Sequence, residues 1–118
     1  MDDKTAVKMY QFGERAKSEL ILVSQLLGVL AELKEKEFAG GKRILLTLMD
    51  GVRSELEFAF HATGAGAFRR AIDHLNEAIG FVESGQPGPA TLRVADAISD
   101  ATTAAQEAWQ VLSGHGLL

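Results

Sequence analysis

The sequence lacks several residue types and patterns on which common functional sites depend. Its 118 residues include no cysteine, which excludes disulfides, thiolate zinc sites and a cysteine nucleophile. The net charge is −4 and no segment is basic, so the positive charge typical of a nucleic-acid binder is missing. No apolar run reaches the roughly 20 residues of a membrane-spanning helix, and no stretch alternates as a strand does. The N-terminal segment is polar, so we expect no signal peptide, no membrane or nucleic-acid partner, and a cytoplasmic location.

The most apolar stretch, Leu20–Leu33, has the periodicity of a helix. Its apolar residues form two adjoining stripes at steps of three and four. One stripe is Leu20, Val23, Leu27 and Leu30, and the other is Leu22, Leu26, Val29 and Leu33. Together they make an apolar arc wider than a surface helix needs. We therefore expect the rest of the chain to cover both stripes.

Glycine and proline divide the chain into four helical segments. The predicted helices span residues 4–37, 42–63, 67–84 and 89–113. Asp2 and Asp3 precede the first helix and can cap it, and Gly40-Gly41 is predicted to end it. Because the connections are short, neighbouring helices should run antiparallel. The predicted fold is a single all-α domain, residues 1–118, forming an up-down-up-down four-helix bundle with an overlong first helix.

The fourth predicted helix is rich in alanine on its inner face. Little side-chain bulk there predicts a close approach to neighbouring helices, with Trp109 filling a gap near one end. The expected inner residues are Ala90, Val94, Ala97, Ile98, Ala101, Ala105, Ala108, Trp109 and Leu112. On the second helix, Leu45, Leu48, Met49, Val52, Leu56, Ala59 and Phe60 share one apolar face.

The first helix, at roughly 50 Å, should overhang the other three, which span about 18–25 residues each. The overhang, within residues 1–14, is apolar, with Val7, Met9, Tyr10 and Phe12. We expect it to complete a homo-oligomer, with a dimer favoured. The alternative is that Gly13 breaks the helix and the N-terminal piece folds back.

A second surface that favours contact is predicted from apolar residues lying off the main helix faces. These are Phe58, Phe81, Ile21, Leu92 and Val111. They predict contacts between subunits or with another protein.

His61 and Glu57 lie four residues apart on the polar face of the second helix and can pair. One histidine with distant carboxylates does not make a metal site, and the inward positions are apolar, so we expect no metal or cofactor. The segment His61–Gly66 resembles the loop after the phosphoacceptor histidine of phosphotransfer domains, which are also four-helix bundles. That resemblance implies phosphorylation of His61, although the lysine of the usual His-x-x-Lys-Gly pattern is missing.

The segment from Arg69 to His74 is similar to the Arg-x4–6-His motif of HEPN ribonucleases, another family of helical bundles. The resemblance implies that Arg69 holds a phosphate and that His74 acts in proton transfer. The alternative is that the residues from Arg69 to His74 have no catalytic role and that His74 only flanks the core on the side of its helix.

Leu45–Ala59 resembles the Leu-x-Leu-Tyr-Asp-Gly core helix of flagellar export chaperones, through Leu48, Asp50 and Gly51. Those proteins are small bundles that hold an unfolded secretion substrate.

From these patterns we expect a non-enzymatic, oligomeric interaction or structural protein. The alternative is a helical-bundle enzyme, either a HEPN-like ribonuclease or a histidine phosphotransfer module. A catalytic bundle needs a cleft with convergent ionisable groups, and the predicted interior has none.

Overall fold

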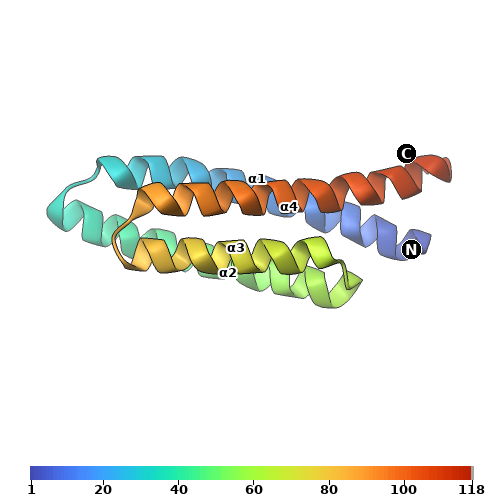
Figure 1. Ribbon diagram of the computed structural model, residues 1–118, viewed down its shortest axis with the longest axis horizontal. Helices are drawn as coiled ribbons and strands as arrows, with labels where there is room; N and C mark the ends of the chain where they lie inside the picture. The colour runs from blue at the N-terminus through green and yellow to red at the C-terminus, as the bar shows by residue number, and fades with distance from the viewer. Residues whose placement is uncertain (118) are drawn as a thin grey trace.

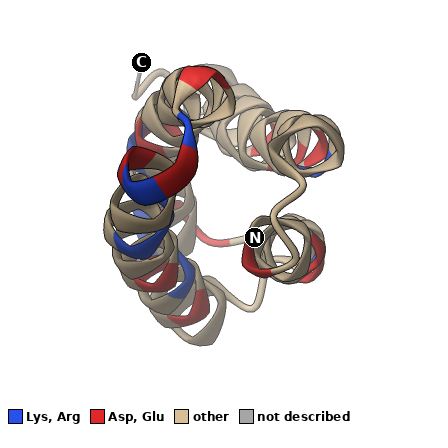
Figure 2. Ribbon diagram, turned by 90° about the vertical axis from the view of Figure 1, so that its left-hand side faces the viewer, with Lys and Arg blue, Asp and Glu red and all other residues tan. Residues whose placement is uncertain are grey.

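The computed structural model describes residues 1–117 as four antiparallel helices without a strand. The helices are α1 (Asp3–Glu32), α2 (Glu35–Thr63), α3 (Gly66–Glu83) and α4 (Pro87–Gly114). Each packs on its two neighbours in the ring α1–α2–α3–α4, giving a rod with extents of 54 × 21 × 18 Å (Figures 1 and 2). The predicted all-α, up-down-up-down bundle is confirmed. None of the described helices is both long enough and apolar enough to cross a membrane.

Two helix boundaries lie at the predicted signals, and a third is displaced by two residues. The Asp2 carboxylate accepts a 2.7 Å hydrogen bond from the backbone N–H of Thr5, which caps α1 and lowers the pKa of Asp2. Gly64 ends α2 at a φ of 67°, a conformation that glycine adopts without a steric penalty. Proline begins α4, at Pro87 rather than at Pro89.

The predicted end of the first helix is wrong. The break lies at Leu33 and Lys34, and Gly40 and Gly41 are inside α2. At Gly41 a Cβ would lie 2.8 Å from the Leu33 Cδ1, so this glycine lets α2 pass close to the end of α1. The turn instead uses Glu35, whose φ is 50° although it is not glycine. As a result α1, at 30 residues, is only slightly longer than α2 and α4, at 29 and 28.

The N-terminal turns of α1 extend beyond α2 and α3, but α4 extends with them (Figure 1). Ala6 and Met9 are buried there, and α1 continues through Gly13 without a break. The alternative in which the N-terminal piece folds back is therefore wrong.

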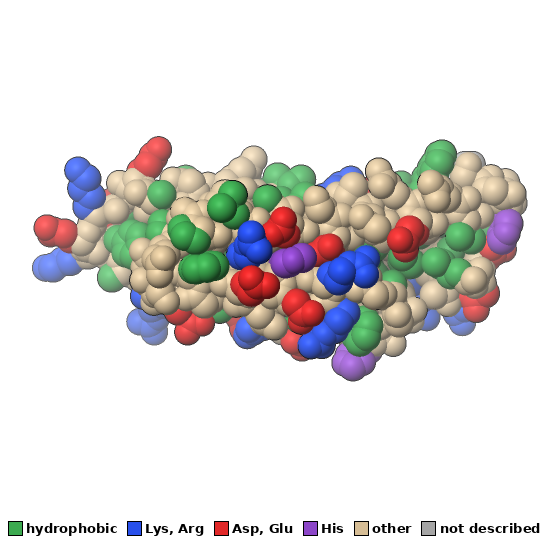
Figure 3. All heavy atoms as spheres, in the orientation of Figure 1, with side chains coloured by type: hydrophobic (Ala, Val, Ile, Leu, Met, Phe, Trp, Pro, Cys, Tyr) green, Lys and Arg blue, Asp and Glu red, His purple; other side chains and the backbone are tan. Residues whose placement is uncertain are grey.

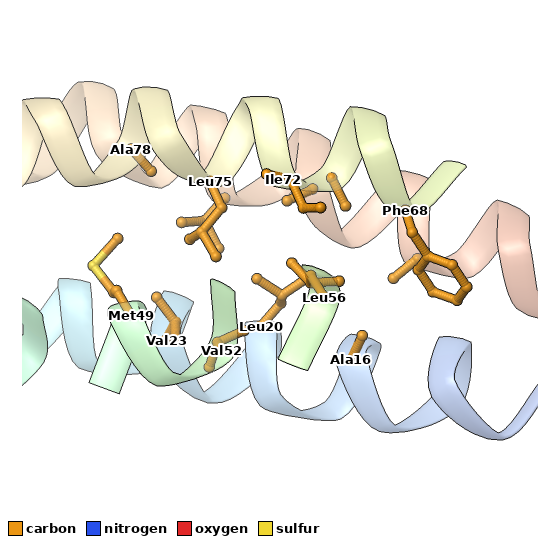
Figure 4. Packing of buried hydrophobic residues seen from close by; sticks show 14 of the residues in the cluster. Ala16, Leu20, Val23, Met49, Val52, Leu56, Phe68, Ile72, Leu75 and Ala78 are labelled. Carbon is orange, nitrogen blue, oxygen red and sulfur yellow. The ribbon is translucent and has the colours of Figure 1, made fainter. Parts of the chain in front are cut away.

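The core is apolar along its whole length. Met49, Val52 and Leu56 of α2 and the buried stripe of α1 face Phe68, Ile72 and Leu75 of α3 (Figure 4). On α4, alanine fills the contact with α1, and a Cβ on Gly13 would lie 2.9 Å from the backbone nitrogen of Ala105. The close approach predicted for α4 is confirmed. The expectation that Trp109 fills a gap in the interior is wrong, because this residue is 49% exposed.

Candidate functional site

The main departure from the predicted core is on the outer side of α1 and α2. Only one stripe of α1, running through Leu20, Val23, Leu27 and Leu30, is buried. Leu22, Leu26 and Val29 of the second stripe are exposed, and Leu33 is half-buried. The expectation that the chain covers both stripes is therefore wrong. The ring of four helices places α3 and α4 against only one side of α1 and α2.

The exposed residues belong to a regular seam, which we call the outer seam. On both helices it advances in alternating steps of three and four, and each member up to Val29 on α1 and throughout α2 lies one residue before a buried position. On α1 it comprises Phe12, Arg15, Glu19, Leu22, Leu26, Val29 and Leu33, and on α2 it comprises Ile44, Leu48, Gly51, Glu55 and Phe58.

Contacts along the α1–α2 pair bring the two halves of the outer seam together. At one end the rings of Phe12 and Phe58 lie 5.8 Å apart, centroid to centroid. At the other, an apolar groove of about 140 Å³ is lined by residues of both helices, among them Leu26, Val29 and Ile44. Its walls are almost free of polar atoms, so nothing in the groove favours water over an apolar side chain.

The apolar section of the outer seam is large for a single chain. Its five exposed members are between 39% and 74% exposed: Leu22, Leu26, Val29, Ile44 and Leu48. Together they present ~500 Å² of apolar surface, near the upper end of the largest patch of a typical monomer. A patch of this size is often functional.

Three charged residues divide the apolar section from the Phe12–Phe58 end. The Arg15 Nη2 lies 2.5 Å from the Glu55 Oε1, and the Arg15 Nε lies 3.2 Å from the Glu19 Oε1. Burial and the adjoining Glu55 raise the pKa of Glu19 to about 7. The second oxygen of Glu55, Oε2, is buried and has no hydrogen-bond partner.

The opposite side of the bundle, formed by α3 and α4, has charged side chains gathered in its middle, with apolar side chains toward both ends (Figure 3). Ion pairs cover it: Arg69 with Asp73, Arg70 and His74 with Asp100, and Arg93 with Glu77 and Asp96. Exposed large apolar residues are fewer there than on the outer seam, with Leu92 and Trp109 on α4.

The Arg69–His74 motif does not converge as the resemblance implies. The Arg69 Nη2 lies 3.4 Å from Asp73, whereas the His74 Nδ1 lies 2.6 Å from the Asp100 Oδ2. It is Arg70 that shares Asp100 with His74, with its Nε 3.7 Å from the Asp100 Oδ1. Asp100, which the sequence patterns did not single out, therefore joins Arg70 and His74 across α3 and α4.

His61 and Glu57 are both exposed on α2, and within the described residues neither an ion pair nor a hydrogen bond joins them. The same part of the chain contains no group of three potential metal ligands. A hollow of about 560 Å³ lies along α2 between Phe38 and Asp50, and no histidine is among the residues that line it.

No family model, curated protein or solved structure matches this chain.

A proposal for function therefore depends on the chain's own residues. Of the predicted interface residues, Val7 and Phe58 are exposed, while Tyr10, Phe12 and Phe81 are half-buried. Tyr10 lines a groove between α1 and α4 with Trp109. Met9 is 2% exposed and belongs to the core, so it is not available to a partner. Sequence reasoning missed Ile44 as a surface residue, although its place in the heptad pattern on α2 could have indicated it.

Proposed function

We propose that this protein is a non-enzymatic interaction or structural protein that works as a homo-oligomer through the outer seam. The single observation that carries the proposal is the second heptad pattern on α1 and α2, which lies outside the chain's own core. Helices with such a pattern are stabilised by packing against further helices. We also propose a cytoplasmic location, which the lack of cysteine suits.

The interior supports a role without catalysis. No polar or charged side chain is fully buried within residues 1–117. The hollow along α2 contains none of the candidate catalytic residues, and a catalytic site needs ionisable groups that converge in a cleft.

A charge substitution on the outer seam tests the proposal. The native chain should elute as an oligomer, and Leu26→Glu should reduce its mass because it places a charge in an apolar contact. Leu92→Glu is the matched control, since Leu92 is 63% exposed on α4, away from the seam. Size-exclusion chromatography with light scattering measures the masses, and circular dichroism checks that each variant is folded. A native monomer, or equal masses for the two variants, would contradict the proposal.

A second candidate function is a helical-bundle nuclease that uses His74. The observation in its favour is the 2.6 Å contact between the His74 Nδ1 and Asp100, which leaves the Nε2 free to exchange a proton. The test is cleavage of single-stranded RNA by the native chain and by His74→Ala. Cleavage that disappears in His74→Ala would favour this function.

A further inference from the structure

Deepening the proposed function, on which it rests, we infer that the outer seam binds a second copy of this chain across a two-fold axis parallel to the helices. In this dimer α1 of each chain packs antiparallel on α2 of the other. The two α1–α2 pairs form a second four-helix contact outside the two cores.

The order of residues along the seam favours this axis. Within one chain, Phe12 lies level with Phe58, and Arg15 lies level with Glu55. A two-fold axis parallel to the helices leaves the position of each residue along the bundle unchanged. Each part of the seam therefore faces the same part of the partner's seam. The aromatic end then meets the aromatic end, and the apolar section meets the apolar section.

An axis perpendicular to the helices fits less well. If it passed through the centre of the apolar section, α1 would face α1 of the partner and the two Phe12–Phe58 ends would point in opposite directions. Phe58, at 66% exposure, would stay uncovered in both chains. The parallel axis covers it.

The area is sufficient for a specific dimer. The five apolar residues of two chains would bury ~1,000 Å², which is about the lower limit for a specific interface. Contacts from Phe12, Phe58 and the charged residues between them extend this toward the usual 1,200–2,000 Å².

The charged residues of the seam are complementary under the same axis. Arg15 lies at the same height along the bundle as Glu55, whose side chain is 41% exposed, so Arg15 of the partner subunit would lie beside the exposed part of that side chain. Glu19, whose pKa is about 7, can hold a proton and so limits repulsion among the four carboxyl groups.

Distances between spin labels test the axis. The chain has no cysteine, so single cysteines can be introduced and labelled without other changes. Arg43→Cys and His61→Cys place labels at exposed sites just before Ile44 and just after Phe58, at the two ends of the α2 part of the seam. With the parallel axis, the two copies of each label lie at the same position along the bundle. The distance between the two labels should then be within about 35 Å at both sites.

With a perpendicular axis through the level of Ile44, the two labels at His61 would be about 50 Å apart, since 17 residues of helix separate the two positions. That result, in a sample whose mass is a dimer, would overturn the inferred axis and leave the proposed function standing. A labelled chain that remains monomeric would overturn both.

A cross-linking measurement checks the register separately. In the inferred dimer Leu26 meets Ile44 of the partner subunit, so an equimolar mixture of Leu26→Cys and Ile44→Cys should form a mixed disulfide faster than either variant alone. Faster cross-linking of Leu26→Cys with itself would overturn the inference.

Discussion

Gly13 of α1 packs directly against Ala105 of α4, so close that a Cβ on Gly13 would lie 2.9 Å from the Ala105 backbone nitrogen. Real Cβ atoms do not approach backbone atoms this closely, and the helices would have to separate to admit one. The glycine therefore sets the spacing of the α1–α4 contact, in which alanine supplies most of the α4 side.

Gly13→Ala should destabilise the fold by about 1–2 kcal/mol. Overpacking costs about 1–3 kcal/mol, and the better helix propensity of alanine offsets up to about 1 kcal/mol of it. Gly28→Ala is the control, because a Cβ there meets nothing within 4 Å and should stabilise α1 by about 0.5–1 kcal/mol. Urea unfolding measures both variants. Equal shifts in the same direction would show that the close approach has no energetic consequence.

Two adjacent leucines of α1 should respond differently to the same substitution. Leu27 is fully buried, so Leu27→Ala should lower the free energy of unfolding by about 2–5 kcal/mol. Leu26 is 43% exposed on the outer seam, so Leu26→Ala should cost less than about 1 kcal/mol in folding but weaken association. Unfolding curves and the dissociation constant, measured for both variants, separate the two effects. A loss of stability for Leu26→Ala as large as that for Leu27→Ala would place Leu26 in the core.

The fold class and most helix ends could be predicted from the sequence because local signals agreed with the tertiary structure. Gly64 lies at a positive φ where the prediction ended a helix, and Asp2 caps the first. The end of α1 could not be predicted, because Gly40-Gly41 resembles a helix stop while the actual turn depends on Glu35, a residue type that rarely adopts a positive φ. Gly41 instead lies inside α2, beside the Leu33 side chain that follows α1.

The candidate site was less predictable for a different physical reason. Periodicity shows that α1 has two apolar stripes, but it does not show which one the chain covers. The buried stripe includes the small residues Ala6, Gly13 and Ala16, and Gly13 packs closely against Ala105 of α4. The other stripe includes Arg15 and Glu19, which cannot enter an apolar core.

The stability contributed by Glu19 should depend on pH. Its pKa is about 7 in the folded chain and ordinarily 4.5, so the folded state binds its proton more tightly. The contribution is therefore full below about pH 4.5 and is lost as the pH rises to about 7. Glu19→Gln removes this titration, so the native chain should lose stability relative to the variant over that range.

Urea unfolding at pH 4.5, 6 and 8, at one protein concentration, measures the difference. Glu107→Gln, an exposed substitution on α4, is the control and should leave the pH dependence unchanged. Parallel stability curves for the native chain and Glu19→Gln would contradict the raised pKa.

Asp100 should matter more for stability than the acidic residues around it. Its side chain is 13% exposed and contacts both His74 and Arg70. Asp100→Ala should cost about 1–2 kcal/mol, because it removes a partly buried hydrogen bond. Asp96→Ala removes an exposed pair with Arg93 and should cost less than about 1 kcal/mol. Thermal unfolding at pH 6 compares them, and equal effects would show that the Asp100 cluster behaves as an ordinary solvated surface.

The most direct test of the outer seam as a contact between copies is the mass of the native chain at equilibrium. Sedimentation equilibrium from low micromolar to high micromolar concentration reports it without any substitution. A dimer of twice the 12.7 kDa chain mass is expected, with dissociation only at the lowest concentrations. A mass of 12.7 kDa across the whole range would contradict the account.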